Sequence, residues 1–195
     1  MRASVTDLEN FRLYQQDDEM TLEALLSRLR KEEPPSDAML AGRALHSWLE
    51  HCATGPAAEA VWGDYTFKFT GDFELAMPNI REMWVQKQYG DLLVRGIVDT
   101  LDGHTIEDHK TTSQFRPERY LEGAQWKMYM DMLGAKRFRW NVFVIYEHDP
   151  KVYEVKALHK LEQVWHEGLE RDCASLAKQF SEFSKKHLPE RWEHT

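Results

Sequence analysis

The sequence predicts an α/β fold in which a mixed central β-sheet is flanked by helices on both faces. Helical spacing fills the N-terminal quarter, strand-like alternation begins at Tyr65, and helical spacing returns in the C-terminal half. With 195 residues, 42% of them hydrophobic, the chain can bury one substantial core. We expect a single domain over 1–195, with N-terminal helices in 1–55, the sheet and a central hairpin in 64–112, and a helix, strands and a closing helix in 117–188.

The N-terminal part reads as three helices. Thr6 or Asp7 is a candidate N-cap for the first, and the second covers Thr21–Arg30. Ser36 is a good N-cap for the third, which Gly55-Pro56 ends.

Strands and two more helices are expected after that. The apolar strand Leu92–Leu101 has two largely apolar faces, which predicts helices covering both sides of it. The other elements follow from alternation or helical spacing. They are strands at Tyr65–Phe69, Ile80–Tyr89, Arg137–Tyr146 and Val152–Leu158, and helices at 117–133 and Lys160–His187.

The stretch Arg95–Thr112, RGIVDTLDGHTIEDHKTT, predicts a β-hairpin with Asp102-Gly103 as its turn. Asp99 then faces Ile106, and Asp108 becomes its diagonal neighbour on the same side of the ladder. Lys110 projects from that face as well. Two carboxylates within reach of one shared cation, beside a lysine, indicate a chemical site.

Hard oxygen ligands of this kind suit magnesium or manganese. Such an ion can polarise a phosphodiester and activate a bound water, and a nearby lysine can orient that water and offset negative charge. Metal-assisted hydrolysis of phosphate esters therefore fits the set, although a D-x-K string alone is very weak.

Composition excludes several other classes. Cys52 and Cys173 have no partner spacing, so neither a disulfide framework nor a cysteine metal cluster is indicated. No apolar run approaches the length of a membrane span, and the N-terminus is too polar for a secretory signal, which predicts an intracellular, cytoplasmic protein. The net charge of −8 argues against indiscriminate nucleic-acid binding but leaves room for a locally basic groove.

Asp99 followed by Asp108-His109-Lys110 resembles the core of the PD-(D/E)XK nuclease superfamily. Gly42-Arg43-Ala44-Leu45-His46 before it, and Gln125-Trp126-Lys127-Met128-Tyr129 after it, are similar to motifs of the RecB-like and lambda-exonuclease-like branch, in the branch's order. The resemblance covers about 4–158 and implies a restriction-endonuclease-like core. Val98 departs from the proline of the family's name.

The resemblance implies a role for each matching residue. Asp99 and Asp108 are metal ligands for Mg²⁺, for which Mn²⁺ can substitute, and Lys110 is the catalytic lysine. Further metal ligands are His46, a backbone carbonyl of Ile106 or Glu107, and, on a looser match, Glu82. Gln125 and Tyr129 bind the DNA backbone or hold the lysine in place. The cysteines of the iron–sulfur branch members are missing, so we expect no iron–sulfur cluster.

A cluster of basic residues surrounds the helix that follows the hairpin. Arg116, Arg119 and Lys127 are best placed to meet phosphates, although a solvated charged face explains each one equally well. Trp62 or Trp126 could stack on an unpaired base, and core packing is the simpler interpretation.

The site residues have structural alternatives too. His46 could be a half-buried helix histidine, and Lys110 could form a purely structural ion pair with the carboxylates. Gln125 and Tyr129 could be ordinary helix residues. The carboxylates could be solvated strand-end charges, but Asp99 follows Gly-Ile-Val in a strand that looks buried, where it needs a cation or strong hydrogen bonds.

The resulting hypothesis is a magnesium-dependent deoxyribonuclease, namely an exonuclease acting at DNA ends in recombination, repair or phage replication. Its expected partners are DNA and a recombination or single-strand-annealing protein, with no membrane. The alternatives are a structure-selective endonuclease of the same fold, or a metal-binding or DNA-binding module that does not cut. Oligomeric state and strand polarity stay open.

Overall fold

The computed structural model describes residues 1–52, 55, 58–71, 73–75, 77 and 80–192. Its helices are α1 (Val5–Gln16), α2 (Leu22–Arg30), α3 (Asp37–His51), α4 (Glu118–Leu121), α5 (Gln125–Leu133) and α6 (Leu169–His187), followed by a 3₁₀ turn at Pro189–Arg191. Its strands are β1 (Arg2–Ser4), β2 (Glu59–Trp62), β3 (Tyr65–Phe69), β4 (Ile80–Tyr89), β5 (Leu92–Asp102), β6 (Thr105–Thr112), β7 (Arg137–Asp149) and β8 (Val152–Val164).

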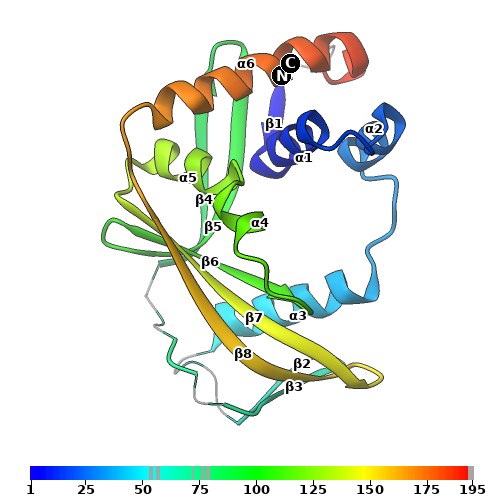
Figure 1. Ribbon diagram of the computed structural model, residues 1–195, viewed down its shortest axis with the longest axis vertical. Helices are drawn as coiled ribbons and strands as arrows, with labels where there is room; N and C mark the ends of the chain where they lie inside the picture. Colours follow the sequence, from blue (N-terminus) through cyan, green and yellow to red (C-terminus); the bar gives the residue numbers. More distant parts are fainter. Residues whose placement is uncertain (53–54, 56–57, 72, 76, 78–79, 193–195) are drawn as a thin grey trace.

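The described strands form one eight-stranded sheet in the order β1-β5-β6-β7-β8-β3-β2, with β4 paired to β5 (Figure 1). Three pairs are parallel, namely β1 with β5, β6 with β7, and β3 with β8, and the others are antiparallel. The predicted mixed sheet is confirmed.

Two hydrophobic cores cover the two faces of this sheet. On β7, Phe138, Trp140 and Val142 belong to the larger core, together with side chains of α1, α2, α5 and α6. The alternate residues Phe143 and Ile145 belong to the smaller core, which α3 shares with β2 and β3. Because side chains alternate along a strand, these two sets face opposite ways, and helices flank both faces as predicted. Figure 1 shows α3 apart from the other long helices, beside the lower part of the sheet.

Helix α1 begins earlier than the sequence suggested. The cap is Ser4, whose Oγ accepts a hydrogen bond from Asp7 N (3.0 Å) while Asp7 Oδ2 accepts one from Ser4 N (2.9 Å). This reciprocal capping box satisfies two backbone donors at once, so Thr6 is already inside the helix.

The predicted helix over 117–133 is split into α4 and α5. The break falls at Gly123, where helix propensity is low. The first backbone donor after it, Ala124 N, donates to Glu9 Oε2 on α1 at 2.6 Å. A contact from a distant segment thus fixes the start of α5, which local spacing cannot reveal.

Strand β8 runs to Val164, so the expected helix start at Lys160 is wrong and α6 begins only at Leu169. Residues 158–164 complete the antiparallel ladder with 137–143 of β7. Glu162 pairs there with Arg139 at 2.6 Å. Apolar residues at Leu161 and Val164 fit helical spacing as well, which explains the error.

The hairpin register also differs from the expectation. The pairs are Asp102–Thr105, Leu101–Ile106 and Thr100–Glu107, so the turn residues are Gly103 and His104. Gly103 has a φ of +56°, the region that glycine tolerates best. The shift is two residues, so side chains keep their predicted faces.

The sequence predicted helices on both sides of β5, and this is wrong for the first half of the strand. Leu92 and Val94 are buried in the larger core, but the alternate residues Leu93, Arg95 and Ile97 are only half-buried. The short strands β1 and β2, which the sequence did not indicate, add edges to the sheet. Pro56, part of the predicted stop for α3, lies outside the described residues.

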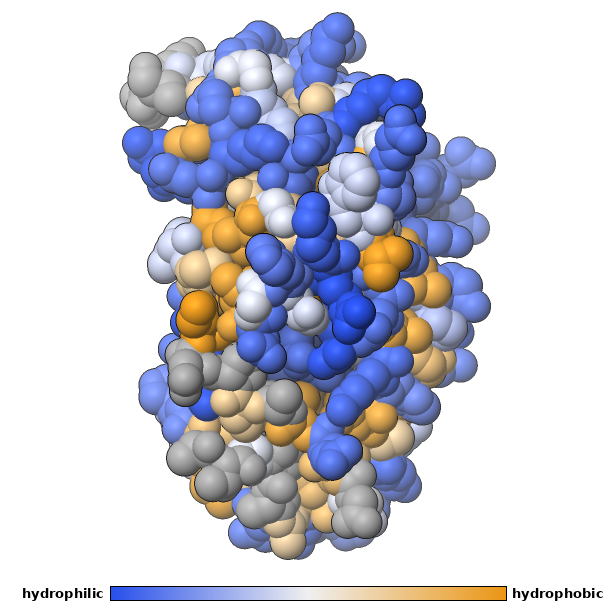
Figure 2. All heavy atoms as spheres, turned by 90° about the vertical axis from the view of Figure 1, so that its left-hand side faces the viewer, coloured by the Kyte–Doolittle hydropathy of each residue, from blue (hydrophilic) through white to orange (hydrophobic). Residues whose placement is uncertain are grey.

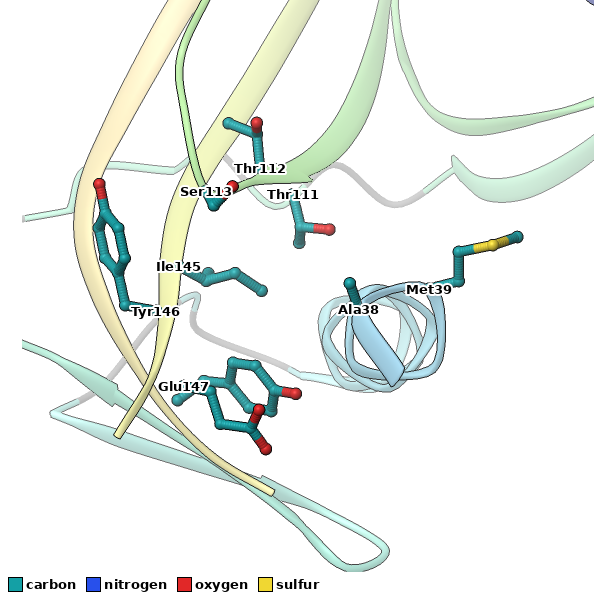
Figure 3. A pocket seen from close by; sticks show the side chains of 9 residues that line it. Ala38, Met39, Thr111, Thr112, Ser113, Ile145, Tyr146 and Glu147 are labelled. Atoms are coloured by element: carbon teal, nitrogen blue, oxygen red, sulfur yellow. The ribbon is translucent and has the colours of Figure 1, made fainter. Parts of the chain in front are cut away.

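Hydrophilic and hydrophobic side chains are unevenly distributed over the surface. On the face in Figure 2, hydrophilic side chains cover most of the upper part, and hydrophobic ones gather in separate groups in the middle and below. None of the described helices combines the length and apolarity that crossing a bilayer needs. Where α3 meets the sheet, a cleft of about 400 Å³ opens. Figure 3 shows Thr111 and Ile145 on one side of it, opposite Ala38 of α3.

Candidate active site

The site forms where strands β5 and β6 part. Their ladder ends at the Thr100–Glu107 pair, and β6 then continues beside β7 alone. Asp99 stands at the fork, and its Oδ2 accepts a hydrogen bond from the backbone N of His109 at 2.7 Å. One carboxylate oxygen is thereby fixed at the point where the sheet opens.

Asp108 is the most enclosed carboxylate of the site, at 4% exposure. Its Oδ1 accepts hydrogen bonds from Lys110 Nζ (2.9 Å) and Gln125 Nε2 (3.0 Å). Oδ2 lies 2.8 Å from Lys110 Nζ but accepts no hydrogen bond with acceptable geometry from the described residues. Burial raises the pKa of Asp108 to about 6, and the neighbouring Asp99 adds to this against the opposing effect of Lys110. An added cation would offset that cost.

Lys110 remains a cation. Burial lowers its pKa, but attraction to Asp108 and Asp99 exceeds this and leaves the pKa above its usual value. Its side chain is 32% exposed, so the ammonium can turn toward solvent. A protonated lysine here can donate hydrogen bonds and offset negative charge.

His46 approaches from the other face of the sheet. Its helix, α3, buries Ala44, Leu45 and Leu49 in the smaller core. His46 Nδ1 lies 3.6 Å from Asp99 Oδ2, too far for a strong hydrogen bond but close enough for both to contact one ion. The predicted helix-borne histidine therefore lies at the fork with Asp99.

Glu82 also faces the fork. The pairs Arg81–Thr100 and Met83–Val98 flank it, which sets it opposite Asp99. Its φ is +50°, a conformation that costs a non-glycine residue about 1–3 kcal/mol and that concentrates at functional sites. Burial raises the pKa of Glu82, and so does the nearby charge of Asp99.

The side chain of Glu107 points away, as the alternation of β6 requires. It is buried on the opposite face, where Oε1 lies 2.6 Å from Arg139 Nη1 and Oε2 accepts a hydrogen bond from Asn141 Nδ2 at 2.8 Å. The backbone carbonyl, proposed from the sequence, is thus all that Glu107 can offer the site. The Arg139 and Asn141 partners had no signal in the sequence.

Gln125 and Tyr129 lie one turn apart on α5 and face the site. Gln125 contacts Asp108 rather than the lysine. Tyr129 is buried and hydrogen-bonds with the backbone of Ile97 and with Gln125. It packs so closely on β5 that a Cβ at Gly96 would lie 2.4 Å from Tyr129 Cε1. This geometry suits positioning of the carboxylate strand.

The three predicted phosphate-binding residues have different surroundings. Arg119 lines a cleft of about 430 Å³ that also contains Lys110, and this α1–α4 cleft includes Glu9, Arg12, Glu118 and Glu122. Lys127 pairs with Asp172 of α6 at 3.3 Å and lines a neighbouring cleft that shares Arg12, Glu122 and Gly123 with the first. Arg116 is exposed and its Nη2 donates to Gln114 Oε1.

Comparison with known protein families identifies the family of this chain. The family model described as the PD-(D/E)XK nuclease superfamily matches residues 14–191. The chain belongs to the PD-(D/E)XK nuclease superfamily. The resemblance seen in the hairpin is therefore confirmed at the level of the superfamily, and so is the restriction-endonuclease-like core.

Two other comparisons add little to this assignment. A search of curated proteins found no match. Among solved structures, the one titled "Crystal structure of SSO0001" is similar, with 13% sequence identity, a TM-score of 0.49, and coverage of 91% of this chain and 73% of that chain.

PD-(D/E)XK nucleases act on DNA with divalent metals, generally Mg²⁺. The donor set at the fork fits such an ion, because the carboxylates supply hard oxygen and Asp108 Oδ2 is buried without a hydrogen bond. Among the described residues, no three His, Cys, Asp or Glu side chains are gathered closely enough to hold an ion as they stand. Binding would require the Lys110 ammonium to turn away from Asp108, and its exposure permits this.

Proposed function

We propose that this protein is a magnesium-dependent deoxyribonuclease that degrades DNA from its ends. The observation that carries the proposal is the convergence of Asp99, Asp108 and Lys110 at the parting of β5 and β6. Asp99 and Asp108 would hold the ion, with His46 and Glu82 as further ligands from α3 and β4.

The chain's own groups have distinct tasks in this proposal. The bound metal would polarise the phosphodiester and lower the pKa of the attacking water. Lys110 donates a hydrogen bond to that water and offsets the charge that develops on the phosphate. Gln125 and the backbone N–H of His109 hold the two carboxylates in orientation. Positioning of this kind contributes to rate because reacting groups must meet at close range.

The first test is digestion of end-labelled linear DNA and closed-circular DNA, with Mg²⁺, Mn²⁺ or EDTA, by the wild-type protein and Lys110→Ala. We expect metal-dependent loss of linear DNA alone, and a reduction of roughly 10²–10³-fold with Lys110→Ala, as for removal of one charge-stabilising donor. Lys178→Glu, an exposed change on α6, is the matched control and should cut normally.

Other results would redirect the assignment. Nicking of the circle would favour an endonuclease of the same fold. If the folded protein binds Mn²⁺ but cleaves neither DNA, the proposal of a nuclease is wrong and the protein is a binding module. The net charge of −8 is compatible with that outcome.

A further inference from the structure

A second cleft adjoins the fork, separate from the α1–α4 cleft. It has a volume of about 490 Å³, and we call it the β1–β5 cleft. Its lining includes Arg2, Lys31, Trp84, Arg95, Ile97 and Tyr129. Ile97 is two residues before Asp99 on β5, and Tyr129 hydrogen-bonds with Gln125, the partner of Asp108. Neither Asp99 nor Asp108 lines the cleft, but Ile97 and Tyr129 connect it to them through the strand and through Gln125.

The β1–β5 cleft carries an excess of positive charge. Its one acidic lining residue, Asp7, is paired with Arg191 at 2.9 Å. Arg2, Lys31 and Arg95 form no ion pair with any other residue that the structure describes, and the buried Nε of Arg95 has no hydrogen-bond partner among them. In a chain of net charge −8, three uncompensated cations in one cleft indicate an anionic ligand.

The α1–α4 cleft provides the contrast. Three glutamates line it (Glu9, Glu118 and Glu122) against three basic residues, and Arg12 is paired with Glu9 at 2.7 Å. Its charges balance, so it offers no comparable attraction for a polyanion. Of these two clefts, only the β1–β5 cleft matches a phosphate backbone in charge.

An exposed indole stands among these cations. Trp84 is 72% exposed, whereas its neighbour on β4, Val85, is buried in the larger core. The alternation of β4 thus turns Trp84 outward into the cleft. The tryptophans considered from the sequence fit stacking less well, because Trp126 is buried and Trp62 already contacts His51, with ring centroids 4.9 Å apart and tilted by 30°.

We propose that the β1–β5 cleft binds a single-stranded nucleic-acid segment next to the scissile phosphate, with its phosphates on Arg2, Lys31 and Arg95 and an unpaired base on Trp84. Aromatic stacking beside a basic groove is the usual chemistry of single-strand recognition. In a duplex the base faces are covered by neighbouring pairs, so Trp84 selects the unpaired strand. The inference deepens the proposed nuclease function and rests on it for its biological meaning.

The test measures binding without cleavage. Fluorescence anisotropy of end-labelled oligo-dT, oligo-U and a DNA duplex would be recorded with Lys110→Ala protein in Mg²⁺, alone and combined with Trp84→Ala. Loss of one stacked base should weaken single-strand binding about tenfold or more and leave duplex binding within about twofold. Trp84→Phe should restore most of the affinity. The two oligomers distinguish DNA from RNA as the strand that the cleft accepts.

Controls separate this cleft from general effects. Trp165→Ala removes another exposed indole, outside the cleft, and should leave every affinity within about twofold. Lys31→Glu and Arg2→Glu change exposed side chains that would each neutralise one phosphate. Each should therefore make the slope of log affinity against log salt concentration for single strands shallower by about 0.7, whereas Lys178→Glu should not change it.

The two proposals fail in different ways. If Trp84→Ala binds oligo-dT and oligo-U as tightly as its parent, or loses duplex binding equally, the cleft inference is overturned even though the nuclease stands. If Trp84-dependent single-strand binding persists in a wild-type protein that cuts nothing, the nuclease proposal fails and the cleft remains.

Discussion

The two faces of the sheet bring different parts of the site together. The larger core underlies Ile106 and α5, and so supports Asp108, Lys110 and Gln125. The smaller core supports α3, which supplies only His46. Asp108 and Lys110 therefore depend on one core and His46 on the other. Damage to the larger core should abolish the whole site, whereas damage to the smaller core should affect metal binding first.

The largest expected effect comes from the larger core. Phe180 of α6 is fully buried there, in contact with Phe11 and Phe183. Phe180→Ala should lower the free energy of unfolding by about 3–5 kcal/mol, through lost transfer energy and a cavity. Urea denaturation measures it. Ile80→Ala, at an exposed apolar position, should cost well under 1 kcal/mol. Equal losses in both variants would contradict the assignment of Phe180 to a tightly packed core.

A substitution in the smaller core should cost somewhat less and affect the site differently. Leu45→Ala removes a fully buried side chain beside His46, with an expected loss of about 2–5 kcal/mol. Because α3 then seats less firmly, Mn²⁺ affinity measured by calorimetry should fall in the protein that remains folded. Met39→Ala, exposed on the same helix, is the control. Unchanged Mn²⁺ affinity in Leu45→Ala would separate His46 from the metal.

His46→Ala tests that separation directly. The side chain is 30% exposed and makes no close hydrogen bond with the residues that the structure describes, so the free energy of unfolding should change by less than about 1 kcal/mol. Mn²⁺ affinity should nevertheless fall about tenfold or more if the imidazole is a ligand. His51→Ala, on the last turn of the same helix, should leave it unchanged.

The smallest expected effect is a difference in the rates at which the two cysteines react. Cys173 belongs to the larger core, and burial raises its thiol pKa to about 12. Cys52 packs at the margin of the smaller core and is only half-buried. Because the thiolate is the reactive form, Cys52 should react with a thiol reagent first, and its rate should rise with pH. Faster labelling of Cys173 in the native protein would contradict the ranking of the cores.

Much of this arrangement follows from local signals. Gly103 restricts the hairpin turn, the alternation of β6 sends Asp108 and Lys110 to one face and Glu107 and His109 to the other, and the chain order of the motifs indicates the superfamily. The roles assigned to individual site residues remain predictions.

What the sequence could not reveal depends on distant contacts. β1 has three residues and forms because β5 offers an edge for parallel pairing. The split between α4 and α5 depends on Glu9, 115 residues away from Ala124. Gly103 is a turn residue both in the predicted pairing of β5 with β6 and in the observed one. The turn residues alone therefore could not distinguish the two registers.

The alternation of side chains between the two faces of β6 limits where residues can be inserted or deleted. Adding or removing one residue inside Thr105–Asp108 would exchange the two faces of the strand, and the carboxylate and lysine would point into the smaller core beside Asn141. The Gly103–His104 turn lies outside the ladder, so insertions there can be absorbed as a longer loop. A probe or tag sequence placed at that turn should therefore leave the site's chemistry untouched, while natural length variation should collect there and be absent from β6.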